Sequence, residues 1–101
     1  MARKVPLSHP GVILLEDFLK PMGITQYRLA RAVGVPPRRI NEIVLGKRGI
    51  SADTALRLGV FFGTDAQSWL NLQTHYDMEL ARDGLEGFLS TIEPLRVMQQ
   101  P

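Results

Sequence analysis

Residues 34–49 read GVPPRRINEIVLGKRG, and this stretch decides the fold. Its two prolines suit the start of a helix, because the N–H groups that proline lacks have no partner in a first turn. Ile40, Ile43 and Val44 then share one face at helical spacing, and Gly46 ends the segment. The stretch therefore predicts a short helix with an apolar face, followed by a basic loop.

Two arginines, Arg38 and Arg39, stand directly after the prolines, in the first turn of this helix. A helix N-terminus carries partial positive charge, which disfavours each exposed cation there by about a few tenths of a kcal/mol. A phosphate or a guanine edge reverses that sign, and the arginine fork fits guanine O6 and N7. We therefore interpret the pair as a nucleic-acid contact rather than as two solvated charges.

The segment before this stretch completes a pair of helices. Thr25 is suited to cap a helix over Gln26–Val33, whose apolar stripe includes Leu29 and Ala30. Two short helices joined by a glycine-containing turn predict a helix-turn-helix over about residues 25–45. In the usual docking of such a unit, the second helix enters the major groove of DNA.

Helical periodicity covers nearly the whole chain. Ahead of the helix pair, an apolar stripe predicts a helix that starts at Pro10 and is stopped by Pro21 and Gly23. The stripe consists of Val12, Leu15, Leu19 and Met22, with Phe18 beside them.

Two longer helices are expected after the basic loop. Ser51 is placed to cap the first of them, and Gly63 stops it. Thr64 with Gln67 three residues later has the pattern of a capping box. It predicts a second helix that runs to about Arg82.

A short last helix is expected near the C-terminus, where Asp83 with Glu86 caps a segment that ends near Ile92. Strand alternation and hairpin-turn dipeptides are absent from the sequence. The chain has 101 residues, of which 45% are hydrophobic, and this is the size and composition of one domain. We therefore expect a single all-α domain of five to six helices over residues 1–101.

Charge is distributed unevenly along the chain. Residues 1–50 contain nine Lys and Arg against three Asp and Glu, a net charge of +6. Residues 51–101 contain three against seven, a net charge of −4. This asymmetry suggests a polyanion-binding face on the basic half. The acidic half either faces a basic protein partner or is simply solvated.

The sequence gives little support to an enzyme or to a metal site. Cysteine is absent, and the two histidines, His9 and His75, lie on different predicted elements, so no zinc cluster is expected. Neither a glycine-rich phosphate loop nor a nucleophile elbow is present. No apolar run reaches the roughly 18 residues of a membrane span. We expect a cytoplasmic protein without a cofactor, and the lack of cysteine is compatible with a reducing compartment.

The predicted helix pair presents a defined set of polar side chains. Pro37, Arg38 and Asn41 lie on the outward face of the second helix, and an asparagine amide fits an adenine edge. Arg39 lies at the border of that face, within reach of a base or a phosphate. Contacts to the DNA backbone are predicted on either side, at Thr25, Gln26, Tyr27, Arg28, Lys47 and Arg48.

The C-terminal part offers more apolar side chains than a small bundle buries. We expect Trp69 and Leu72 to complete the core, and residues 78–95 to form a dimer or partner surface. A dimer provides two recognition helices about 34 Å apart, the distance between successive major grooves. The predicted contact residues are Leu85, Phe88, Leu89 and Ile92. A protein-interaction module without DNA binding remains an alternative.

A resemblance to phage-repressor-like (XRE-type) regulators is carried by the segment ITQYRLARAVGVPPRRINEIVLGKRGISADTALRLGVFFG. A wider resemblance, over about residues 7–95, is to the HigA/VapI antitoxin family. It is carried by the lead-in HPGVILLEDFLKPMGITQ, the continuation NEIVLGKRGISADTALRLGVFFGTDAQSWLNLQTHYDMELA and the tail IEPL.

The resemblance implies a five-helix DNA-binding core of the phage-repressor type, a homodimer on a palindromic double-stranded operator, and autorepression of a toxin–antitoxin operon. It also implies a small basic ribonuclease toxin of the HigB kind as partner. By matching positions it carries base contacts to Pro37, Arg38, Arg39 and Asn41, and a phosphate contact to Gln26. The alternative is a stand-alone XRE-type regulator without a toxin.

Overall fold

The computed structural model describes residues 7–95, and all regular structure in this range is helical. The elements follow in the order α1 (Pro10–Ile13), η1 (Leu14–Leu19), α2 (Lys20–Met22), α3 (Gln26–Val33), α4 (Pro37–Val44), α5 (Ala52–Phe62), α6 (Ala66–Gly84) and η2 (Leu89–Thr91). The first three are continuous parts of one helix. The described residues thus contain five helices and a final single turn, which confirms the predicted all-α fold.

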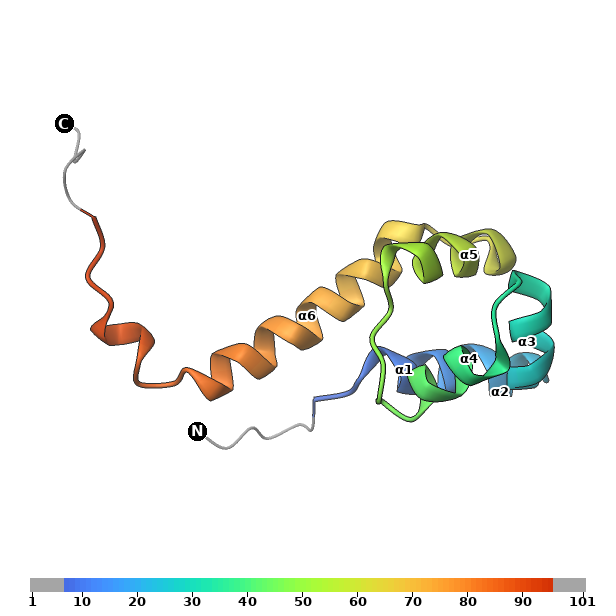
Figure 1. Ribbon diagram of the computed structural model, residues 1–101, viewed down its shortest axis with the longest axis horizontal. Helices are drawn as coiled ribbons and strands as arrows, with labels where there is room; N and C mark the ends of the chain where they lie inside the picture. Colours follow the sequence, from blue (N-terminus) through green and yellow to red (C-terminus); the bar gives the residue numbers. More distant parts are fainter. Residues whose placement is uncertain (1–6, 96–101) are drawn as a thin grey trace.

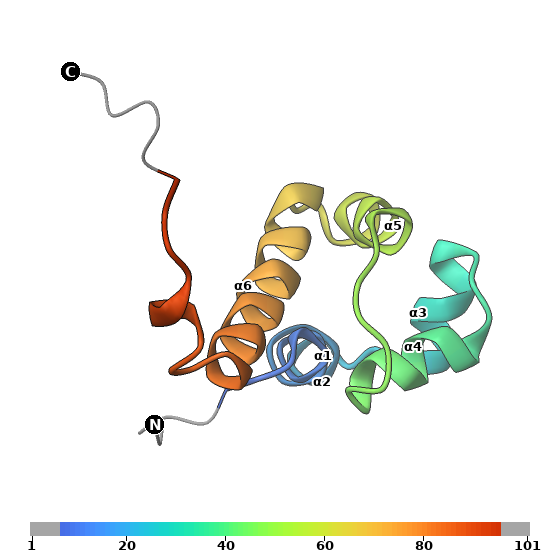
Figure 2. The same ribbon diagram turned by 60° about the vertical axis from the view of Figure 1, so that its left-hand side comes forward.

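The described chain consists of a body, residues 7–77, and a C-terminal segment, residues 78–95, and the boundary between them lies within α6. In the body, α5 and the start of α6 lie on one side, α1, α2 and α4 lie on the other, and α3 closes one end (Figures 1 and 2). The C-terminal segment extends away from it. The buried core lies wholly in the body and consists of Leu14, Leu19, Leu29, Ala30, Val33, Val35, Ile40, Ile43, Ile50, Ala55, Leu58 and Trp69.

The predicted first helix is confirmed, but its buried face differs in part from the predicted one. Leu19 is buried as predicted, whereas Val12 and Met22 are exposed and Leu14 is buried. The reason is the π-helical segment η1, whose backbone hydrogen bonds join residues five apart, so that residues at this spacing share a face. Pro21, which lacks an N–H, lies two residues after η1 and removes one helical hydrogen bond. A regular 3.6-residue period does not reveal this change of register.

Gly11 allows the first helix to touch α4. A Cβ at this position would overlap the carbonyl oxygen of Ile43 and lie 3.0 Å from the Cα of Val44. Next to it, His9 caps the helix, and its Nδ1 accepts the N–H of Gly11 at 2.9 Å. The His9 ring packs edge-on against Tyr76 of α6, with the ring centroids 4.9 Å apart. The start of the first helix is therefore fixed to both α4 and α6.

The caps predicted for α3 and α5 are confirmed, and the cap predicted for α6 is wrong. The side chains of Thr25 and Ser51 each accept the backbone N–H three residues later. At α6 the N-cap is Asp65, which accepts the N–H two residues later. Thr64 instead accepts the indole N–H of Trp69 at 2.8 Å, because a buried tryptophan needs a partner for that group.

The short sixth helix predicted to end near Ile92 is reduced to the single 3-10 turn η2, whose C-cap is Ile92, and its predicted cap at Asp83 is wrong. α6 continues through Asp83 and ends at Gly84, and turns and η2 follow it. Gly87 has φ 88°, a left-handed conformation that interrupts a helix. Every residue from 80 to 95 is exposed, so no packing compensates for nucleating another helix.

Candidate nucleic-acid interface

α3 and α4 form the helix-turn-helix predicted over residues 25–45. In the turn, Gly34 has φ 74°, and the N–H of Val35 bonds to the carbonyl of Ala30 at 3.0 Å. Val35 and Ile40 are buried and seal the corner between the two helices. Because this face of α4 packs inward, its opposite face is turned to solvent.

The outward face of α4 carries two of the predicted base-contacting residues. The Arg38 side chain is 85% exposed, and Asn41 is exposed about one turn later. The Nδ2 of Asn41 donates to the Oε1 of Gln26, at the start of α3, over 3.3 Å. Three predicted contact residues from two helices therefore lie on one surface.

Glu42 connects this face to the basic loop. Its carboxylate accepts from the Nε of Arg38 and lies 2.9 Å from the Nη2 of Arg48. The hydrogen bonds from Arg38 and then from Arg48 hold the pKa of Glu42 below its ordinary value. The i, i+4 spacing of Arg38 and Glu42 signals the first of these pairs in the sequence. Glu42 thus keeps two predicted DNA-contacting arginines close together.

Arg39 is placed differently from Arg38. Its side chain is 29% exposed, and its Nη1 lies 2.9 Å from the Oδ1 of Asp53 in the first turn of α5. Asp53 also pairs with Arg57, and the hydrogen bonds from Arg57 and then Arg39 lower the pKa of Asp53. The protein itself engages Arg39, so its base contact stays a prediction that requires this ion pair to open. Sequence reasoning missed the pair because 14 residues separate its members.

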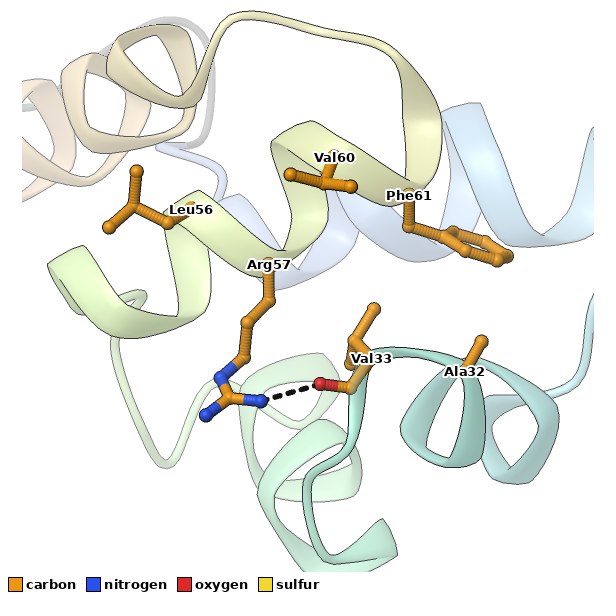
Figure 3. A pocket seen from close by; sticks show the side chains of 6 residues that line it. All are labelled: Ala32, Val33, Leu56, Arg57, Val60 and Phe61. Carbon is orange, nitrogen blue, oxygen red and sulfur yellow. Dashed lines mark hydrogen bonds between the residues drawn. The ribbon is translucent and has the colours of Figure 1, made fainter.

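Arg57 ties α5 to the turn of the helix pair. Its Nη1 donates to the carbonyl oxygen of Val33 at 2.7 Å (Figure 3). Arg57 also lines an open groove of about 420 Å³ between α3 and α5, whose other lining side chains are apolar. Leu56 and Val60 at this groove are 62% and 86% exposed. An apolar lining does not suit a phosphate backbone, which polar and basic groups bind.

The predicted phosphate contacts flank α4. Tyr27 and Arg28 are exposed on α3, and Lys47 and Arg48 are exposed on the loop after α4. In the described part of the chain, the charged ends of Arg28 and Lys47 form no ion pair. The Tyr27 hydroxyl accepts from the Nη1 of Arg31 at 3.1 Å. Two cations without a carboxylate partner are thus available to an external anion.

α4 begins without a side-chain cap. Pro36 is the N-cap, with an extended backbone at φ −62° and ψ 141°, and Pro37 is the first helical residue. The N–H of Arg39 bonds back to the carbonyl of Pro36 at 2.9 Å. The two prolines therefore fix the first turn through backbone restraint, where α3 and α5 use a hydroxyl. Pro37 is exposed, and its base contact stays a prediction.

Other kinds of site find little support in the structure. Across the residues that the structure describes, no three His, Cys, Asp or Glu side chains gather as a bound metal ion requires. None of the helices formed by residues 7–95 is long and apolar enough to cross a bilayer.

Comparison with known proteins identifies the family. A family model described as helix-turn-helix matches residues 15–69, a range that includes α3, α4 and α5. Virulence-associated protein I of Dichelobacter nodosus is 54% identical over 92 residues, which cover 91% of this chain and 84% of that protein. The chain belongs to the helix-turn-helix family.

Within this family, the helix-turn-helix protein is similar to antitoxins. Antitoxin HigA-1 of Vibrio cholerae is 32% identical over 87 residues, 86% of this chain and 82% of that protein. The solved structure of Pseudomonas aeruginosa antitoxin HigA with the higBA promoter matches with a TM-score of 0.85 and 44% identity. That match covers 89% of this chain and 99% of the other. The resemblance to the HigA family is thereby confirmed.

Proposed function

We propose that this helix-turn-helix protein is the DNA-binding antitoxin of a type II toxin–antitoxin module. It binds a palindromic operator as a homodimer in the cytoplasm and represses its own operon. The observation that carries the proposal is the outward face of α4, where Arg38 and Asn41 are exposed beside Gln26. Arginine and asparagine are the side chains that pair with guanine and adenine edges in the major groove.

The similarity to Pseudomonas aeruginosa HigA, whose structure was solved with promoter DNA, supports this use of α4. Arg28 and Lys47 supply cations on either side of the helix and are placed to contact phosphates. Arg38 and Arg48 are held by Glu42 until DNA is present. Exposed ion pairs contribute little to stability. Exchanging Glu42 for a phosphate or a guanine edge as the partner of these arginines therefore costs little free energy.

The homodimer is proposed to form through the C-terminal segment. Leu85, Phe88, Leu89 and Ile92 are between 42% and 60% exposed, although all four are large and apolar. An apolar patch of this kind on a small protein marks an interaction surface. A second copy of the segment buries it and brings two α4 helices to one operator.

A small basic ribonuclease of the HigB kind is proposed as the toxin partner. The antitoxin relatives and the acidic character of residues 51–101 support it. The alternative is a stand-alone regulator. Co-expression with the neighbouring small reading frame decides between them. An antitoxin restores growth and co-purifies with the neighbouring product, whereas a stand-alone regulator does neither.

Operator binding is tested by fluorescence anisotropy with a labelled duplex from upstream of the reading frame and a scrambled duplex. Arg38→Ala combined with Asn41→Ala should lose at least about tenfold in affinity for the upstream duplex and most of the preference over the scrambled one. Lys20→Ala is the matched control, because it removes one positive charge from the exposed surface of the first helix, where Lys20 pairs with Glu16. Wild-type protein that binds both duplexes equally at low salt would refute the proposal.

A further inference from the structure

A side chain of α6 is attached to the loop that carries Lys47 and Arg48. The Oε1 of Gln73 accepts the backbone N–H of Ile50 at 2.8 Å, across 23 residues of sequence. The Nε2 of the same amide donates to the Oδ1 of Asp77, one turn later in α6, at 2.9 Å. Both ends of the Gln73 amide are therefore engaged, and a rotated amide loses both hydrogen bonds.

Gly49 makes room for this contact. A Cβ at Gly49 would lie 3.0 Å from the amide carbon of Gln73 and 3.1 Å from its oxygen and nitrogen. The next residue, Ile50, is 3% exposed and belongs to the core. Gln73 thus contacts the backbone between the exposed cations Lys47 and Arg48 and the buried residue Ile50. From there the connection runs up to α5 (Figure 1).

The other hydrogen bonds of the loop are local. The N–H groups of Lys47 and Arg48 both bond to the carbonyl of Glu42, at 2.8 and 3.2 Å. These bonds shape the loop relative to α4 and do not fix it to the rest of the body. In the described part of the chain, Gln73 is the side chain from a distant element that hydrogen-bonds to residues 46–50.

We infer that Gln73 is a positioning residue for the DNA interface. It holds residues 46–50 against α6, so that Lys47 and Arg48 meet the phosphates while α4 lies in the major groove. The inference rests on the proposed function and deepens it. Gln73 does not contact DNA itself and acts by holding the loop whose cations do. The C-terminal part of α6 belongs to the C-terminal segment. The same helix therefore positions both the proposed dimer surface and the phosphate-contacting loop.

Gln73→Met tests the inference, because methionine nearly keeps the size of glutamine and forms neither hydrogen bond. The helical content measured by circular dichroism should be unchanged. Affinity for the upstream duplex should fall about two- to tenfold, the factor that corresponds to one net hydrogen bond. The salt dependence of log K should become shallower by about 0.9 for each phosphate that the loop no longer touches. Gln67→Met is the matched control, because among residues 7–95 the exposed Gln67 side chain bonds only to Asn71, one turn later in α6.

A rescue separates positioning from mere stabilisation. Gln73→Glu places a second carboxylate against Asp77 and should weaken binding. Adding Asp77→Asn to Gln73→Glu should restore affinity and salt slope, since the asparagine donates to the new carboxylate, which still accepts from Ile50. Hydrogen exchange of the Ile50 amide, measured without DNA, should be fast in Gln73→Met and protected in the rescued double variant.

The possible results are distinct. A Gln73→Met protein with wild-type affinity and slope would overturn the inference, as would reduced affinity with an unchanged slope. Unchanged protection of the Ile50 amide would show, independently of DNA, that Gln73 does not hold the loop. A wild-type protein that ignores duplex DNA would instead refute the proposed function.

Discussion

The body and the C-terminal segment are both rich in large apolar residues, yet they use them in opposite ways. In the body these residues close on one another around Trp69, which is 2% exposed. In the C-terminal segment, Phe88 is 60% exposed and Leu95 is 85% exposed. The difference teaches that the body encloses a core of its own, although Leu56 and Val60 stay exposed on α5, whereas no residue from 80 to 95 is buried within the described chain.

The largest expected effect is on the body. Gly11→Ala forces a methyl group into the carbonyl oxygen of Ile43, so the free energy of unfolding in urea should fall by about 2–3 kcal/mol. Gly84→Ala, at the end of α6, is the control, because no atom lies within 4 Å of its added Cβ. It should be neutral or stabilising by up to about 1 kcal/mol. Equal losses of stability at both positions would contradict the contrast between the two regions.

The next effect is on the C-terminal segment. Phe88→Asp with Leu89→Asp should raise the dimer dissociation constant about 30-fold or more in sedimentation equilibrium, because it places charge in an apolar contact. The monomer should keep its helical content, since neither residue packs on the core. Val60→Asp is the control, because Val60 is 86% exposed on the body. A dimer that Val60→Asp dissociates instead would place the interface at α5.

A smaller effect is expected where Arg57 joins two helices of the body. Arg57→Met removes the ion pair with Asp53 and the bond to the carbonyl of Val33. Because the Arg57 side chain is 39% exposed, solvent screening reduces the loss of stability to about 1 kcal/mol in urea unfolding. Arg82→Met, which breaks a surface pair on α6, should cost less than about 0.5 kcal/mol. A ranking in the reverse order would refute this role of Arg57.

The smallest effect is a pH dependence at the junction of α1 and α6. Burial lowers the pKa of His9 below its ordinary value of 6.5, against the opposing charge of Asp77. The unfolded chain therefore binds the proton more readily, so the free energy of unfolding decreases as the pH falls below 6.5. His9→Asn keeps a capping side chain without titrating and should flatten urea-unfolding midpoints between about pH 7 and 5. If the His9→Asn variant kept the wild-type change of the urea-unfolding midpoint with pH, a group other than His9 would cause the pH dependence.

The sequence predicted the helix pair and most of the boundaries, because caps and glycines are local signals. Thr25, Ser51 and Gly34 each act within one turn of their own position. It missed the π-helical segment of the first helix, where Val12 and Met22 are exposed, and the end of α6 near Gly87, where an amphipathic pattern found no partner within the described chain. Local pattern does not contain the tertiary contact that decides such cases.

The candidate site shows the same limit. Arg38 and Asn41 were predicted to face outward from the helical period alone, and they do. The pairing of Arg39 with Asp53 and the bond from Ile50 to Gln73 join residues distant in sequence. No spacing rule predicts them, because they depend on how α4, α5 and α6 pack.

The π-helical segment η1 has a consequence for variation in chain length. Leu14 and Leu19 both face the core while five positions apart. Deleting one residue between them would leave them four apart, the spacing at which an ordinary α-helix presents two side chains on one side. The segment therefore provides a place where relatives can differ by one residue and keep the same fold.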